Sequence, residues 1–264
     1  MNHPSASSQP YGTYLVERDL VIAAPREIVF CYFTDSERWA SWWGQGSHIE
    51  PRAGAPYLIR YPNGATASGV VVEAVPPERL VLTYGYDDPS KPIPPGGSKV
   101  VIALDEHSRG TLLKLRHYVD TEALREMHVP GWRYQLAVFA QVVMKANFAS
   151  APERIDAYYK AWSVSDLTER ERLLESCAAP DIAFADAFGC TLGIADLIGH
   201  IAACSVHFPG VTLRPTNTPR MTQEVAISDW EAVMGDKTVM CGSNVFEFAS
   251  NGMISRVTGI AAPK

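Results

Sequence analysis

The sequence predicts an α+β protein made of two domains. Its 264 residues are enough for two hydrophobic cores, and 47% hydrophobic with 20% charged residues is a globular composition. Apolar segments of strand type lead into one long helical segment, and after a short hinge at 147–152 a new series of helices and strands begins. We therefore expect a disordered tail over residues 1–10, a first domain over 11–149 and a second over 150–264.

The first half is predicted as a strand, two short helices, a series of strands and one long helix. Pro25 suits the first turn of a helix, and Ser36 suits the cap of the next one. The long helix is predicted over residues 121–149, where Pro130 should kink or split it. The predicted strands lie between turns rich in Pro, Gly and Asn, at residues 14–23, 48–51, 56–61, 65–75, 79–86, 98–105 and 112–118.

Three of the six tryptophans lie within five residues: Trp39, Trp42 and Trp43. A buried indole usually needs a partner for its N–H group, so this cluster is either the wall of an apolar cavity or a dense packing cluster. We expect Trp39 or Trp42 to face a cavity. Strand alternation makes His117 a further candidate for this cavity, opposite Trp132 of the long helix, the alternative being a histidine packed in the core.

Several segments of the first half resemble the START-like (SRPBCC) helix-grip superfamily, and within it the subfamily named after the activator of the heat-shock 90 kDa ATPase. The resemblance implies a curved antiparallel sheet around a long C-terminal helix, with an internal cavity for an apolar ligand. A superfamily of this kind serves many functions, so the resemblance bears on the fold. The matching segments are 23–30, 42–44, 51–54, 69–81 and 110–113.

The second half is predicted as three helices and a bent sheet. Arg154 begins the first amphipathic helix, and Thr168 with Glu171 forms a capping box at the start of the second. Asn251-Gly252 is a strong signal for a hairpin turn. The second and third helices are predicted at 168–177 and 193–206, and the strands at 182–186, 211–219, 224–234, 238–249 and 253–260.

The order of short motifs in this half resembles the nuclear-transport-factor-2-like cone, and within it the SnoaL-like group of polyketide cyclase relatives. The resemblance implies three helices on a bent sheet that encloses a cavity, and a homodimer formed through the open face of the sheet. The motifs are found at 158–162, 184–189, 193, 209–211, 229–230, 242–246 and 251–254.

Polar residues on apolar strand faces are the candidate site residues of the second half. Asp186 shares a strand face with Phe184, and a carboxylate in an apolar pocket is suited to proton transfer because burial raises its pKa. The alternative is that Asp186 caps a turn. Asn244 lies among apolar neighbours and needs hydrogen-bond partners. The resemblance places Trp162 and Trp230 toward the same cavity.

Several functional classes find no support in the sequence. A net charge of −6 disfavours nucleic acid, and no apolar run is long enough to span a membrane. Five widely spaced cysteines are expected as free thiols in a cytoplasmic protein, with neither a metal nor a cofactor. His200 and His207 have no partner at metal-ligand spacing and are expected as surface or satisfied core residues. Motifs of serine hydrolases, kinases and dehydrogenases are missing.

Three functions remain. The first is binding of a small apolar or aromatic ligand, polyketide-like or steroid-like, in one or both cavities. The second is a cofactor-independent cyclase or isomerase, with Asp186 as general base and Asn244 or Trp230 orienting an oxygen. The third is a protein-interaction module of the co-chaperone type.

Overall fold

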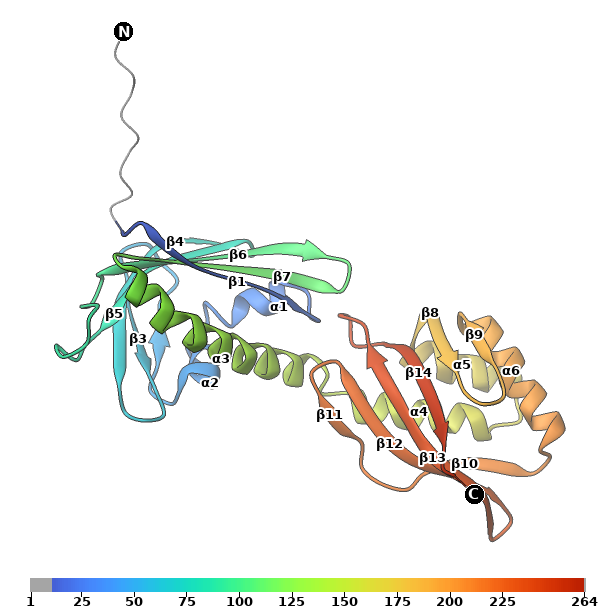
Figure 1. Cartoon of the computed structure of the whole chain (residues 1–264). Coiled ribbons are helices and arrows are strands. Elements are labelled where there is room, and N and C mark those ends of the chain that lie inside the picture. Colours follow the sequence, from blue (N-terminus) through green and yellow to red (C-terminus); the bar gives the residue numbers. More distant parts are fainter. Residues whose placement is uncertain (1–10, 264) are drawn as a thin grey trace. The chain divides into compact units, whose positions relative to one another are not determined.

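Two antiparallel-rich sheets, each with its own helices, form the architecture of this chain (Figure 1). The computed structural model describes residues 11–263, so the predicted disordered tail over 1–10 lies outside the described residues. Two compact units are divided between Val143 and Met144. The predicted α+β class, a sheet with a long helix followed by a second α+β unit, is confirmed.

The first unit is a seven-stranded, fully antiparallel sheet with three helices. Its strand order is β1-β7-β6-β5-β4-β3-β2. The elements are β1 (Tyr14–Ile22), α1 (Arg26–Cys31), α2 (Ser36–Trp43), β2 (His48–Ile49), β3 (Pro56–Arg60), β4 (Thr66–Val75), β5 (Arg79–Tyr86), β6 (Ser98–His107), β7 (Gly110–Val119) and α3 (Glu122–Asn147).

The long helix α3 covers the inner face of this sheet and holds the core of the unit. Phe139 of α3 stacks on Phe33 with ring centroids 4.6 Å apart and meets the Trp42 ring edge-on at 4.9 Å. Helix α3 runs without interruption although Pro130 lies inside it, so of the predicted kink or split the split is wrong. Burial of His128 before the proline and of Leu136 after it fixes the helix on both sides of Pro130, and this tertiary packing outweighs the local cost.

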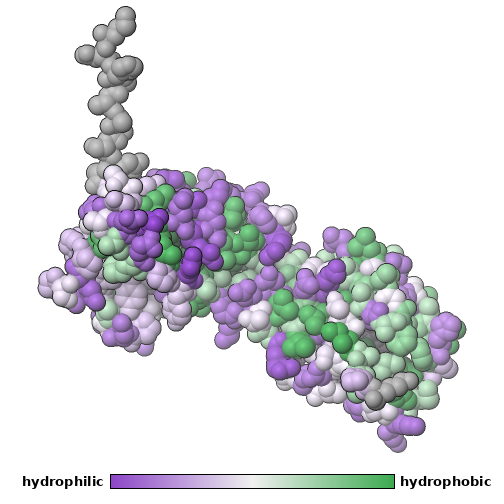
Figure 2. All heavy atoms as spheres, viewed as in Figure 1, coloured by the Kyte–Doolittle hydropathy of each residue, from purple (hydrophilic) through white to green (hydrophobic). Residues whose placement is uncertain are grey.

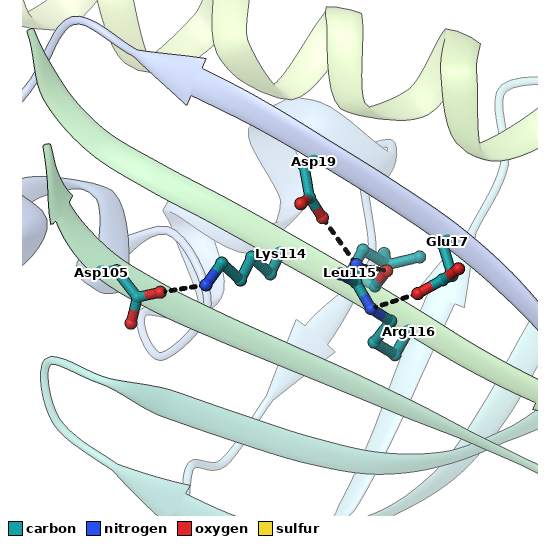
Figure 3. A network of polar contacts seen from close by, with 6 residues as sticks. All are labelled: Glu17, Asp19, Asp105, Lys114, Leu115 and Arg116. Atoms are coloured by element: carbon teal, nitrogen blue, oxygen red, sulfur yellow. Dashed lines mark hydrogen bonds and ion pairs between the residues drawn. The ribbon is translucent and has the colours of Figure 1, made fainter.

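The outer face of the same sheet carries charged side chains in cross-strand pairs (Figure 3). Arg116 on β7 donates to Asp19 at 2.6 Å and lies 3.0 Å from Glu17, both on β1. Lys114 pairs with Asp105 of β6 at 2.6 Å. Exposed pairs of this kind contribute little to stability, and they mark a solvated face.

The second unit is a sheet with one parallel pair and three helices. Its strand order is β10-β12-β13-β14-β8-β9, with β11 paired to β12, and β14 runs parallel to β8. The elements are α4 (Ala151–Ser163), α5 (Leu167–Cys177), β8 (Ala178–Ala185), β9 (Cys190–Leu192), α6 (Ile194–His207), β10 (Val211–Pro215), β11 (Arg220–Thr222), β12 (Val225–Met234), β13 (Lys237–Phe248) and β14 (Ile254–Ala261).

The helix caps differ from the predicted ones by one or two residues. Asp35, not Ser36, caps α2 and accepts from the backbone N–H of Arg38 at 2.9 Å. Ser36 instead bonds to the backbone of Ile49. Asp166, not Thr168, caps α5. In both places a free carboxylate next to the expected cap accepts the hydrogen bond, and a carboxylate is the favoured group at a helix N-terminus.

Candidate functional site

A cavity of about 130 Å³ lies in the second unit, between the sheet and helices α4 and α6. Its polar lining comprises Asp186, Cys204, Ser205 and Asn244. Most of the remaining wall is aromatic or aliphatic, the composition expected of a small-molecule site. The aromatic lining residues are Tyr158, Trp162, Phe184, Phe188, Phe208 and Trp230.

The floor of this cavity is a row of residues across neighbouring strands. Asn244 of β13 pairs with Gly259 of β14, and both line the cavity; Ser228 of β12 pairs with Asn244 from the other side and is buried outside the lining. A Cβ at Gly259 would lie 3.1 Å from both Asn244 Oδ1 and the Cβ of Asp186. The missing side chain at Gly259 therefore lets the carboxylate and the amide approach each other on the same floor.

Asp186 both caps a turn and lines the cavity, so the two alternatives considered from the sequence, a turn cap and a pocket carboxylate, are both present. Its Oδ1 accepts from the backbone N–H groups of Phe188 at 2.7 Å and Gly189 at 3.0 Å. The same oxygen lies 4.0 Å from Nε2 of His200 on α6, and both side chains are less than one-fifth exposed. The turn thus holds the carboxylate in place at the cavity wall.

Three hydrogen-bond donors on the cavity-lining residues are buried without a partner among residues 11–263. They are the hydroxyl of Tyr158 and the indole N–H groups of Trp162 and Trp230. Burial raises the pKa of Tyr158 well above its ordinary value, so the hydroxyl keeps its proton, and the nearby Trp162 N–H lowers that pKa. Each such buried donor costs about 1–3 kcal/mol.

Asn244 is held by the residue next to Tyr158 in the chain. Burial raises the pKa of Tyr159 to about 12, and hydrogen bonding with Ser228 and Asn244 lowers it. The Tyr159 hydroxyl donates to the carbonyl oxygen of Ser228 at 3.4 Å. Tyr159 is thus satisfied within the protein, in contrast to Tyr158.

Sequence reasoning did not place Cys204 in this site, and it expected His200, which lies behind the cavity wall beside Asp186, only as a surface or satisfied core residue. Their spacing of four on α6 places them on one helix face, and this was the available signal. The Cys204 Sγ lies 3.6 Å from His200 Nε2, the same nitrogen that faces Asp186. Burial and the Asp186 charge raise the pKa of the Cys204 thiol, so the pair lacks the thiolate and the relay geometry of a cysteine nucleophile.

A second, larger cavity of about 490 Å³ lies in the first unit, between α3, β5 and the loop that follows β3. Trp132 lines it, as the sequence predicts for a residue of the long helix. Its principal aromatic lining residues are Trp43, Tyr61, Tyr84, Tyr86, His128 and Trp132.

Trp39 and Trp42 do not line this cavity, contrary to the sequence-based expectation. The Trp39 indole N–H donates to the carbonyl of Leu58 at 3.2 Å, and that of Trp42 donates to the carbonyl of Tyr32 at 3.1 Å. Both rings pack inside the aromatic cluster, and their polar atoms are satisfied there. Trp43, the third member, stands in the cavity wall instead.

His117 lies behind the cavity wall and is locked in one neutral form. Its Nδ1 accepts from the Trp132 indole at 3.0 Å, so Nε2 carries the proton and faces Ser98 Oγ at 2.8 Å. Burial, with a smaller contribution from His128, lowers the pKa of His117 to about 3. A histidine that donates to the serine cannot deprotonate it, so Ser98–His117 is not a nucleophilic dyad.

Comparison with known proteins bears mainly on the first unit. Residues 23–144 match the family model described as activator of Hsp90 ATPase homolog 1-like protein. The matched range covers most of the first unit. No curated protein matches the chain significantly.

Several solved structures are similar to parts of the chain at low sequence identity. A SnoaL-like family protein from Agrobacterium tumefaciens is 21% identical with a TM-score of 0.41, and the match covers 45% of this chain and 99% of that one. The Aha1 dimer from Colwellia psychrerythraea is 15% identical with a TM-score of 0.43, covering 50% and 96%. Protein CV1439 from Chromobacterium violaceum is 24% identical with a TM-score of 0.40, covering 49% and 96%.

Two further findings concern residues 11–263. Within that range, the acidic, histidine and cysteine side chains form no group of three or more that could hold a metal ion. No helix there has the length and apolar character needed to cross a membrane.

Proposed function

We propose that the chain binds a small, flat, apolar ligand that carries an oxygen acceptor, and that the cavity of the second unit is the site. Polyketide-like aromatics and steroid-like ketones have this chemistry. The observation that carries the proposal is the set of three buried donors without a protein partner, on Tyr158, Trp162 and Trp230. A ligand oxygen among them would remove their desolvation cost, and the aromatic wall would hold the rings.

Two neighbouring tyrosines on α4 provide a matched test. Tyr158→Phe removes a hydroxyl that has no partner within the protein, so we expect unchanged or higher stability of the free protein. Tyr159→Phe removes a hydroxyl bonded to Ser228, so stability should fall. Binding is measured as the rise in melting temperature with a panel of anthraquinones and steroid ketones, each beside its parent hydrocarbon.

The proposal predicts that ketones stabilise the wild type more than hydrocarbons and that Tyr158→Phe weakens this preference by roughly fivefold to tenfold in affinity, as for the loss of one hydrogen bond. Tyr159→Phe should keep the preference once its lower stability is taken into account. A wild type that no member of the panel stabilises would contradict the proposal. So would a Tyr158→Phe variant that has become unstable and retains the ketone preference.

Proton transfer in the same cavity is the second candidate function, favoured by the position of Asp186. Its Oδ1 is occupied by the turn, which leaves Oδ2 as the free acceptor next to the floor residue Asn244. The carboxylate would remove a proton from the carbon next to a ligand carbonyl, the negative charge would develop on the oxygen among the buried donors, and the proton would return at a second carbon.

Asp186→Asn tests this second function without breaking the turn, because an amide oxygen accepts the same two backbone N–H groups. We expect ligand binding to survive while conversion of a β,γ-unsaturated ketone into its conjugated isomer is lost. If the wild type binds such ketones but converts none of them, the proposed enzyme activity is rejected and the chain is a binding protein.

We also propose that two copies of the chain pair through the outer face of the second sheet. Leu192 and Ile260 on that face are 71% and 57% exposed. Hydrophobic residues gather on the surface of the second unit in the view of Figure 2. Sedimentation equilibrium gives the mass directly, and Leu192→Glu should shift it from that of a dimer to that of a monomer.

A further inference from the structure

Two phenylalanine rings from different elements meet at the mouth of the cavity in the second unit. Phe188 lies in the short loop between β8 and β9, and Phe208 directly follows α6. Their ring centroids lie 5.6 Å apart with an angle of 66° between the planes, and both residues line the cavity. Their exposed fractions are 52% and 41%, so the pair stands at the solvent end of the site.

The hydrogen-bond donors of this cavity stand at its buried end. Tyr158 and Trp230 are both buried, and so is the floor residue Asn244. A ligand whose oxygen reaches these donors therefore directs its remaining rings toward the mouth. The lining residues that are exposed are Ala187, Phe188, Ser205, Phe208, Val239 and Ala261.

Between these two ends the cavity has room for about one ring. Its volume is about 130 Å³. A protein cavity of about 150 Å³ holds a single benzene molecule, whereas sites for larger small molecules begin at about 300 Å³. A molecule of three fused rings is too large for the cavity while the phenylalanine pair stays in place, so it reaches the buried donors only after the two rings separate.

The structure allows this separation by rotation of side chains, with the backbone held in place. The N–H group of Phe188 donates to Asp186 Oδ1 at 2.7 Å, and that of Phe208 donates to the carbonyl oxygen of Cys204 at 2.9 Å. Exposed side chains change rotamer readily, so the pair can open while both turns are kept. Opening loses the edge-on ring contact, which is equivalent to a factor of roughly three to ten in affinity.

We propose that Phe188 and Phe208 set the size specificity of this site. With the pair closed, the site accepts a ketone built on one ring, and larger ring systems bind more weakly because they must open the pair. This inference rests on the proposed function and narrows its preferred ligand to single-ring ketones.

Four compounds that differ in ring number and in one oxygen test the proposal on the whole chain. Acetophenone and 2-acetylphenanthrene carry the same methyl ketone on one ring and on three rings, and benzene and phenanthrene are the corresponding hydrocarbons. Incorporation of 5-fluorotryptophan makes the titration specific to this site, because Trp162 and Trp230 line it and their ¹⁹F resonances report occupancy. We expect the wild type to bind acetophenone more tightly than 2-acetylphenanthrene.

Substitutions of the pair then assign the size limit. Phe188→Ala and Phe208→Ala should each raise the affinity for 2-acetylphenanthrene relative to acetophenone by roughly tenfold, since the ring contact is already lost and the mouth is wider. Both rings are about half exposed, so the fold should survive truncation, which urea unfolding checks. Phe188→Leu and Phe208→Leu keep more of the packing and should change the ratio in the same direction by less.

Val206→Ala is the matched control. Val206 lies on α6 close to Phe208 and is 77% exposed, but it is outside the cavity lining. This variant should keep the wild-type ratio of the two ketone affinities. A shift equal to that of Phe208→Ala would show that any change at this end of the helix alters the ratio, and it would overturn the proposal.

Two further results would also overturn it. One is tighter binding of 2-acetylphenanthrene than of acetophenone by the wild type, and the other is a ratio that both alanine variants leave unchanged. The hydrocarbons separate this inference from the proposed function. If ketones bind no better than hydrocarbons while the preference for one ring still depends on the pair, oxygen recognition fails and the size limit stands. If the preference for ketones holds and the pair has no effect, the size limit alone is rejected, and binding of none of the four compounds rejects both.

Discussion

Trp230 on β12 lies directly opposite Gly242 on β13, and its ring covers the space that a side chain at Gly242 would need. A Cβ built at Gly242 would approach Trp230 Cζ2 to 2.7 Å and the carbonyl oxygen of Ile260 to 2.3 Å. The tryptophan therefore reaches its position in the cavity wall because the residue opposite is a glycine.

Gly242→Ala should lower the free energy of unfolding by about 1–3 kcal/mol, because the methyl group overpacks the sheet against backbone as well as the indole. It should also weaken ligand binding in the second unit, since Trp230 must move. Gly199→Ala is the control: it is exposed on α6 with no atom within 4 Å of the new Cβ, and it should gain up to about 1 kcal/mol from helix propensity. Urea unfolding measures the free energy of unfolding of both variants. Equal effects of the two substitutions would refute the packing argument.

His117 should make the first unit less stable in acid. Its pKa is about 3 in the folded chain and near 6.5 when unfolded, so between these values the unfolded state binds more protons. The stabilisation is complete above about pH 6.5 and is lost as the pH falls toward 3, at about 1.4 kcal/mol per unit. His128, whose pKa burial also lowers, adds to the same trend.

Urea unfolding between pH 4 and pH 8 checks this slope. His117→Gln should be less stable at pH 8, because it disturbs the hydrogen bonds with Trp132 and Ser98, and its stability should depend less on pH. A variant with the wild-type slope would show that another group causes the acid sensitivity.

Arg170 should be essential for the junction between α4 and α5. It is 2% exposed and donates through Nε to the Ala161 carbonyl at 3.1 Å and through Nη2 to the Val164 carbonyl at 2.5 Å. Arg170→Met leaves these two carbonyls without a charged donor, and the expected loss is about 1–3 kcal/mol in thermal or urea unfolding. Arg172→Met on the same helix removes only an exposed ion pair with Glu169 and should have little measurable effect.

The order of elements could be predicted from apolar periodicity and turn residues, but their ends and interruptions were less predictable. Asp35 and Ser36 are both good caps, and the choice between them depends on the bond of Ser36 to the distant Ile49 backbone. The short strand β9 was not predicted, because its residues pair with β8 only after the loop at Asp186 has folded back. The strand expected over 211–219 ends at Pro215 as β10, since proline donates no ladder hydrogen bond, and the short β11 at Arg220–Thr222 lies beyond the expected range.

The sequence by itself determined the α+β class, the aromatic character of both halves, and the apolar strand face on which Asn244 lies, because side-chain alternation and periodicity are local properties of a chain. Tertiary structure alone decided which polar groups have partners. It satisfied the indoles of Trp39 and Trp42 within a packing cluster, placed Trp43 in a cavity wall, and brought His200 to Asp186. Hydrogen-bond satisfaction depends on atoms that are distant in sequence, and for that reason it cannot be derived from spacing along the chain.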